Sequence, residues 1–352
     1  MKKLLLLPLL LLAVTPLLAQ ERPVSQTEYV QMLYGIKGQA SVSTVVEAVR
    51  RRGINFPVTD GLRGLTRSKS ANNEDLKRAL EEAERRRQNP DSTKLPAPAD
   101  SQAILDKTRE NTLALIDDMP DFVVKQLITR SEAFAGTGNW RPYDNLIIAV
   151  SYSDENGEQY KVLSKNGAPA DLQSSRSYSG LDGATSGGEF VEDLKKIFKP
   201  ESKTRFEAES TDIIRGRNAV IFAYEIDLAN NKHGGVGLKG PVYRSSPAGE
   251  KGRLWIDRDN FRVLRIEYKL TDIAPTFPVK AVTKSIDYDQ VEISGEKYLL
   301  PVLSDFRGTV ESSGKMFESR NVIRFRNYQK YGTEVTIVEE DTKPVEDEKP
   351  RD

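Results

Sequence analysis

The chain contains no cysteine and only one histidine, His233, among its 352 residues. The lack of cysteine excludes disulfides, thiolate zinc sites, iron–sulfur clusters and cysteine nucleophiles. A single imidazole excludes His-rich metal sites and most acid/base schemes that rely on a pair of imidazoles. The chain also has no excess of charge of either sign, because it contains 52 lysine and arginine residues and 52 aspartate and glutamate residues. A net charge of zero gives no reason to expect nucleic acid or an acidic membrane as a partner.

Long apolar runs are absent except at the very start. Met1-Lys-Lys3 supplies positive charge, Leu4 to Leu18 is apolar, and Ala19-Gln20 fits a cleavage point. This run is shorter than the roughly 20 residues that span a bilayer. Residues 1–19 are therefore predicted to be a signal peptide, the alternative being a retained anchor. The protein is predicted to be secreted into the periplasm, with no transmembrane span after cleavage.

Residues 20–88 are predicted to form a small helical unit. Thr44 and Glu47 have the spacing of a capping box, and Gly53 ends the helix that they open. Arginine triplets at residues 50–52 and 85–87 end two of the predicted helices, where positive charge is favourable. The triplets are interpreted as solvated helix ends, the alternative being a patch for nucleic acid or anionic lipid.

The composition also marks the boundaries of a second, larger region. Residues 89–102 are rich in proline and small polar side chains, which predicts a semi-rigid linker. Residues 339–352 are rich in acidic side chains, lysine and proline, which predicts a disordered tail. Residues 103–338 are predicted to be one half-barrel domain.

Strand patterns dominate that domain. From Phe261 to Leu270 the chain alternates between an apolar face with Leu264, Ile266, Tyr268 and Leu270 and a charged face with Arg265, Glu267 and Lys269. The Asp/Asn run at residues 257–260 predicts a turn before it. Similar patterns recur from Phe122 onward, with helices predicted near residues 104–119 and 188–198. About ten strands without strand–helix alternation predict antiparallel pairing.

The predicted fold class is α+β. It consists of a large antiparallel, partly closed sheet, a half-barrel, which two amphipathic helices cover and a helical N-terminal unit precedes. Such a concavity is either packed solid or left as an apolar groove for a lipid-like or peptide ligand, and the sequence leaves both open. The candidate groove-lining residues are Phe190, Leu194, Val220, Phe222, Tyr224, Ile226, Leu254, Ile256, Leu264, Ile266 and Tyr268.

Two short motifs have the spacing of known sites without their structural context. Gly235–Gly240 matches a dinucleotide-binding loop, but no helix follows to receive the phosphate, and a flexible loop is predicted instead. Ser312-Ser-Gly-Lys315 has the spacing of some acylating enzymes, but it joins two extended segments rather than opening a helix. His233 is interpreted as a solvated loop residue.

Pairs of carboxylates are the remaining candidates for chemistry. Asp257/Asp259 and Asp287/Asp289 do not supply the roughly six or more oxygens that calcium takes, and all four are interpreted as solvated. No cofactor, metal site or catalytic residue is predicted. An enzyme would need a cluster of perturbed carboxylates with His233 in one cleft.

Two resemblances extend this prediction. Gly252-Arg-Leu-Trp-Ile-Asp257, Arg262-Val-Leu-Arg-Ile-Glu267 and Tyr298-Leu-Leu-Pro301 resemble a family of uncharacterised secreted bacterial proteins, over roughly Ile104 to Val338. That family implies no function. The helix before the first strand and the Trp-Ile-Asp, turn, Arg-Val-Leu hairpin are similar to the lipoprotein-carrier (LolA-like) fold. That resemblance implies acyl chains held in a half-barrel under helical lids, although the carrier's functional arginine matches no residue here.

The predicted function is therefore that of an exported, non-enzymatic envelope protein. Its half-barrel would bind lipid, lipoprotein acyl chains or another apolar ligand, or an envelope protein. The alternative is a protein-interaction or sensor module of the envelope that uses the N-terminal helices and the Gly-rich loops.

Overall fold

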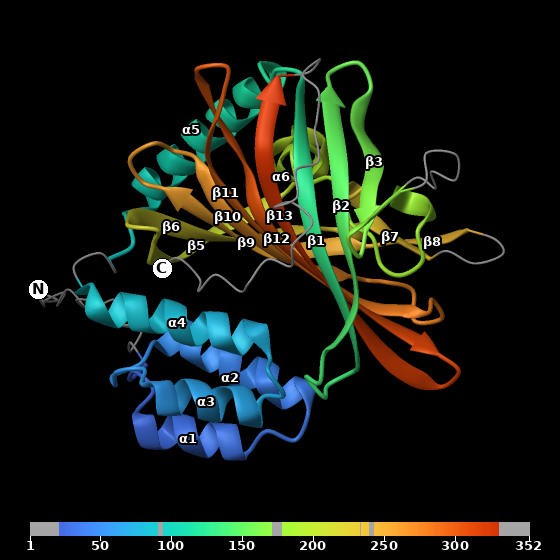
Figure 1. The fold of residues 1–352 in the computed structure, drawn as a ribbon. Helices are drawn as coiled ribbons and strands as arrows, with labels where there is room; N and C mark the ends of the chain where they lie inside the picture. Colours follow the sequence, from blue (N-terminus) through green and yellow to red (C-terminus); the bar gives the residue numbers. More distant parts are fainter. Residues whose placement is uncertain (1–20, 91–93, 171–177, 233, 239–242, 331–352) are drawn as a thin grey trace, which may run out of the picture.

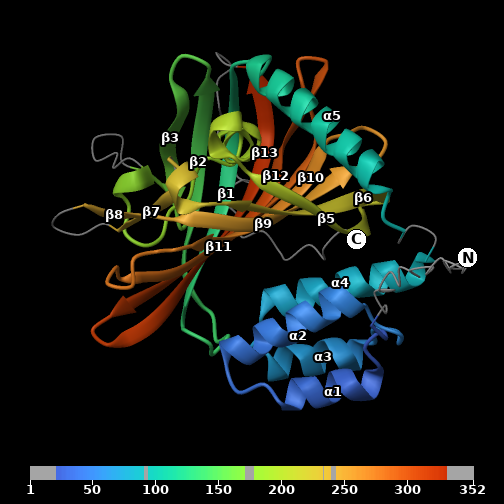
Figure 2. The same ribbon diagram turned by 180° about the vertical axis from the view of Figure 1, so that it is seen from behind.

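The computed structural model describes residues 21–90, 94–170, 178–232, 234–238 and 243–330. The predicted signal peptide, His233 and the acidic tail lie outside the described residues. An 11-stranded antiparallel sheet has helices α5 (Pro98–Asp117) and α6 (Glu192–Phe198) against one face, which we call the inner face (Figures 1 and 2). The N-terminal helices lie against the opposite, outer face. The predicted α+β fold with a partly open sheet is confirmed.

Helices α1–α4 enclose an apolar core of their own, to which Tyr29, Leu33 and Leu80 belong. Ser25, Thr59 and Asn73 side chains accept backbone N–H groups at the starts of three of these helices. The capping box predicted at Thr44 is wrong, because the second helix starts five residues earlier in the chain and the Thr44 hydroxyl donates to the Ala40 carbonyl inside it. The bounds are α1 Gln26–Tyr34, α2 Gln39–Arg52, α3 Asp60–Lys69 and α4 Glu74–Gln88.

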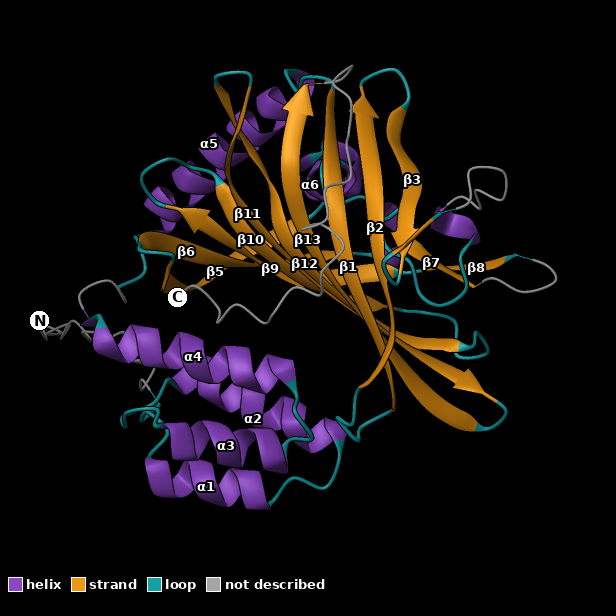
Figure 3. Cartoon of the chain, in the orientation of Figure 1, coloured by secondary structure: helices purple, strands orange, loops and turns teal. Residues whose placement is uncertain are grey.

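The sheet runs in the order β4-β3-β2-β1-β13-β12-β11-β10-β9-β6-β5, mostly between neighbours in sequence (Figure 3). Long strands near the middle of the sheet twist past one another, and one end of the sheet extends to the lower right of Figure 1, away from α5 and α6. The bounds are β1 Phe122–Phe134, β2 Arg141–Ser153, β3 Gly157–Lys165, β4 Ala168–Pro169, β5 Arg205–Ile214, β6 Arg217–Ile226, β9 Gly249–Asp257, β10 Val263–Thr271, β11 Val279–Ile293, β12 Glu296–Ser312 and β13 Lys315–Lys330.

A two-stranded ribbon, β7 (Gly235–Leu238) and β8 (Arg244–Pro247), forms a separate sheet that packs through Val236 and Leu238 against Val279 and Val282 of β11. The described part of the Gly235–Gly240 motif is therefore a strand, and the flexible loop predicted there is wrong for these residues. Ser312 ends β12 and Lys315 opens β13, so the Ser-x-x-Lys motif is a hairpin turn.

Helix α5 begins inside the segment predicted to be the linker. Pro98 occupies its first turn, where the missing N–H costs nothing, so the irregular segment before it ends at Ala97. No helix in the described ranges is long and apolar enough to cross a membrane.

Candidate functional site

The inner face is a packed apolar core rather than an open groove. Most of the predicted groove-lining side chains lie in this one cluster between the sheet and the two helices, with Tyr268 half-buried at its edge. Phe190 packs against Phe122 and Phe325, with ring centroids 5.3 Å apart in each pair. The members from the predicted set are Phe190, Leu194, Val220, Phe222, Tyr224, Ile226, Leu254, Ile256 and Ile266.

Leu264 is the exception among the predicted residues. A register shift between Val263 and Arg265 inserts one extra residue into β10. Val263 therefore joins the inner core, whereas Leu264 packs with Trp255 on the outer face. The prediction that Leu264 and Ile266 share a face is wrong because strict alternation does not survive a β-bulge.

Buried ion pairs fasten α6 to the sheet. The Lys284 ammonium lies 2.9 Å from Asp193 and 3.0 Å from Glu189. Lys196 Nζ lies 3.1 Å from Asp193 and 2.6 Å from Glu250. Burial lowers the pKa of Lys284, but the attraction of Asp193 and Glu189 outweighs it and holds the pKa well above the usual lysine value. A charged lysine thus sits inside an apolar core, paired on both sides.

A tyrosine extends this network toward β9. The Tyr224 hydroxyl donates to Glu250 at 2.7 Å, and a Cβ on Gly252 would lie 2.4 Å from the Tyr224 ring. Glycine at this position is therefore what lets the ring lie close to the strand. Burial raises the pKa of Glu250, against the pull of Lys196.

A second carboxylate near this network holds its proton unusually tightly. Burial first, and then the charge of Glu189, raise the pKa of Glu158 to about 7. The Tyr160 hydroxyl and the Gly188 N–H donate to its Oε2. These perturbed carboxylates line neither of the two cavities described below.

Helix α5 covers the inner face through a mixture of aliphatic and hydroxyl side chains. The buried residues of this 20-residue helix are Ser101, Leu105, Thr108, Thr112 and Ile116, and Ile104, Leu113 and Leu115 pack beside them. The Thr108 hydroxyl donates a hydrogen bond to the Ile104 carbonyl at 2.8 Å. Because hydroxyl side chains interrupt this aliphatic face, α5 gains less from burial than a helix with an unbroken apolar stripe.

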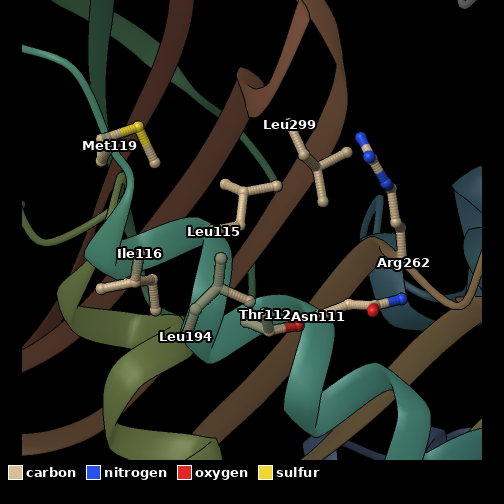
Figure 4. A pocket seen from close by; sticks show the side chains of 8 residues that line it. All are labelled: Asn111, Thr112, Leu115, Ile116, Met119, Leu194, Arg262 and Leu299. Atoms are coloured by element: carbon tan, nitrogen blue, oxygen red, sulfur yellow. The ribbon is translucent and has the colours of Figure 1, made fainter.

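A narrow crevice runs beneath α5 beside α6 and β12 (Figure 4). Its cavity volume is about 10 Å³, room for about one water molecule and for no acyl chain. Arg262 lies at its side, and the Arg262 Nη1 atom is buried without a hydrogen-bond partner among the described residues. The lining residues are Asn111, Thr112, Leu115, Ile116, Met119, Leu194, Arg262 and Leu299.

A wider, open cleft of about 810 Å³ flanks the first half of α5. It lies between that half of the helix and the tip of the β9–β10 hairpin, where Phe261 and Ile104 contribute apolar surface and Arg258 and Lys107 positive charge. Helix α5 is therefore bordered by this open cleft along its first half and by the one-water crevice along its second half. A hydrogen bond ties the tip to the helix, from Asn111 Nδ2 to the Phe261 carbonyl at 3.4 Å.

The predicted acidic pairs divide between structural and solvated roles. Asp257 is buried, pairs with Arg217 at 2.9 Å and accepts the Asp259 N–H, which builds the predicted turn. Asp287 pairs with Arg265 at 2.7 Å. The interpretation of Asp257 and Asp287 as solvated is wrong. Within the described residues, no group of three or more His, Asp or Glu side chains is placed to hold a metal.

The arginine triplets also differ from their interpretation. Arg50 lies 3.2 Å from Glu267, and Arg85 lies 2.9 Å from Asp212, so both reach the outer face of the sheet. Only Arg51 is as solvated as predicted, with 69% of its side chain exposed. Sequence alone shows the charges, but these partners of Arg50 and Arg85 lie 217 and 127 residues away in the chain.

Comparisons with known proteins give only distant likenesses. No family model matches the chain, and no curated protein matches it. A crystal structure of a DUF1329 family protein from Desulfovibrio piger is similar at 11% identity, over 65% of this chain and 95% of that one, with a TM-score of 0.31. The complex of MucA and MucB from Pseudomonas aeruginosa matches at 11% identity over 62% and 94%, with a TM-score of 0.17. Likenesses this remote carry no conclusion about function.

Proposed function

We propose that the protein is an exported, non-enzymatic envelope protein that binds an apolar chain with an anionic head between helix α5 and the inner face of the sheet. The structure then represents the closed, ligand-free state. The observation that carries the proposal is the crevice under α5, where aliphatic side chains and the free Nη1 of Arg262 lie together.

The two helices on the inner face are held to the sheet by different kinds of contact. Helix α6 is anchored by Asp193 and Lys196 inside the core. Helix α5 has hydroxyl side chains on its buried face and free volume beside it. Movement of α5 away from the sheet would expose aliphatic side chains of the inner face. A bound apolar ligand would bury these side chains again and so offset the free-energy cost of opening.

Arg262 suggests the chemistry of the ligand's head. A guanidinium N–H that is buried without an acceptor carries a desolvation cost, which a carboxylate or phosphate group would relieve through a charge-assisted hydrogen bond. The expected ligands are therefore fatty acids and related anionic lipids.

Fluorescent fatty-acid binding tests this proposal. Wild-type protein is expected to bind an anionic fatty-acid probe, and Arg262→Gln to bind it at least tenfold more weakly, about 1.4 kcal/mol. Arg258→Gln is the matched control, since Arg258 belongs to the same hairpin tip but lines the other cleft. A neutral apolar probe should not distinguish Arg262→Gln from wild type.

A second experiment tests the proposal by cross-linking α5 to the tip of the β9–β10 hairpin. Because the chain has no cysteine, an Asn111→Cys/Phe261→Cys variant can be bridged specifically by a bis-maleimide. The bridged protein is expected to lose probe binding, while the same variant without the reagent keeps it. Equal binding by both forms, or no binding by wild type, would refute the proposal.

A second candidate function is a protein-interaction module of the envelope that works through the N-terminal helices. The supporting observation is that these helices meet the sheet through ion pairs instead of a shared core. A partner captured by the full chain, and lost when the ion pairs are removed, would favour this function over ligand binding.

A further inference from the structure

The outer face of the sheet carries a small apolar patch centred on Trp255. Its indole N–H donates to Asp212 at 2.9 Å, and the Arg253 guanidinium lies 4.8 Å from its ring. The patch is completed by Ile214, Ala219, Ile221 and Leu264. A buried tryptophan surrounded by charges has the composition of an interaction hot spot.

Helix α4 covers this patch with a stripe of alternating charge. Glu74, Arg78, Glu82 and Arg85 follow one another at spacings that place them on one side of the helix. Each of these four side chains lies close to an oppositely charged side chain of the sheet. The closest approaches are Arg78–Asp305 at 3.2 Å, Glu82–Arg253 at 2.8 Å and Arg85–Asp212 at 2.9 Å, with Glu74–Arg307 at 3.7 Å.

Helix α2 adds one more contact of the same kind. Arg50 pairs with Glu267, which also lies 3.8 Å from Arg78. The outer face thus selects a particular order of acidic and basic side chains, because each mismatch would leave a partly buried charge beside a like one.

The apolar cores on the two sides of this interface are separate. The cluster inside α1–α4 includes no residue of the sheet, and the Trp255 patch includes no residue of the helices. Undocking the helices would therefore leave both cores intact. The atoms exposed would be mainly charged groups, which water and salt solvate well, together with the Trp255 patch.

We propose that the outer face is a docking surface for a helix with the charge order of α4, and that the chain's own helical unit occupies it reversibly. A second copy of this chain supplies an equivalent unit, so the surface exchanges one copy's helices for another's. This inference rests on the second candidate function, because it identifies the surface that an interaction module would use.

The test follows transfer of the helical unit between molecules. A protease site is inserted at residues 91–93 of the full chain, and the folded protein is purified and then cut. Cut protein with a donor fluorophore on its helical unit is mixed with cut protein that carries an acceptor fluorophore on its sheet domain. Energy transfer then reports that the donor-labelled unit has moved to the sheet domain of the other molecule. Transfer is expected, and it should be several-fold faster at high salt.

A charge swap is the matched control. Arg253→Glu alone places a third carboxylate beside those of Glu82 and Glu209, both of which pair with Arg253, and should abolish retention of the cut unit. Adding Glu82→Arg should restore retention. The near-ultraviolet circular dichroism of the inner-face aromatics reports whether each variant stays folded.

The inference would be overturned by a unit that never transfers at any salt concentration, or by folded single and double variants that retain it equally. Transfer between copies without capture of any other protein would support the docking surface and refute the envelope-partner function. Failure of the docking surface can therefore be distinguished from failure of the second candidate function.

Discussion

The two faces of the sheet are covered by different kinds of contact. On the inner face, α6 and α5 bury a continuous apolar core, and the charges of Lys284 and Glu250 are enclosed within it. On the outer face, α4 rests on buried and partly buried ion pairs around Trp255. Burial of apolar surface contributes about 25 cal/mol per Å², whereas the attraction within a buried ion pair is largely offset by the cost of taking both charges out of water. The inner cover is therefore held mainly by apolar burial, and the outer cover by paired charges.

The largest effect is expected from the centre of the inner face. Phe190→Ala removes a fully buried ring that contacts Phe122 and Phe325, and should lower the free energy of unfolding by roughly 3–5 kcal/mol. Urea denaturation measures it. Phe134→Ala is the control, because that side chain is 54% exposed and its loss should cost far less. Equal costs would mean that the inner core is not the main source of stability.

A buried charge should come next. Lys284→Met leaves the carboxylates of Glu189 and Asp193 buried beside an apolar group, and should cost about 3 kcal/mol. Lys280→Met on the same strand breaks a half-exposed pair with Glu311 and should cost about 0.5 kcal/mol. Both values come from urea denaturation. A Lys284 variant as stable as the Lys280 variant would contradict the assignment of these ion pairs as anchors of α6.

The pH dependence of stability gives a smaller effect with a defined sign. Because burial and Glu189 raise the pKa of Glu158 from 4.5 to about 7, the folded protein keeps a proton that the unfolded chain releases. The free energy of unfolding should therefore fall as the pH rises from about 4.5 to about 7 and level off above that. The contribution is on the order of 1–3 kcal/mol. Glu158→Gln should flatten the slope, and an unchanged slope would assign it to other groups.

The strand faces could be predicted from the sequence wherever alternation is unbroken. Val220, Phe222 and Tyr224 lie together as expected, because β6 pairs with β9 without a register shift. Leu264 was misplaced because a bulge depends on the neighbouring strand, which a single segment does not reveal.

The charged contacts could not be predicted at all. Lys284 interrupts the apolar face of β11 between Val282 and Ile286, which signals a buried charge only once the strand is known to face the core. Its partners on α6, like those of Arg85 on β5, are distant in sequence. Composition gives the number and sign of charges, but only tertiary structure pairs them.

The most direct test of the difference between the two faces is the accessibility of Trp255. Trp140 is the only other tryptophan, so Trp140→Phe makes the fluorescence report on Trp255 alone. Acrylamide quenching of this variant should increase several-fold with added salt, while the near-ultraviolet signal of the inner-face aromatics stays constant. A Trp255 that remains protected until the whole protein unfolds would contradict the account.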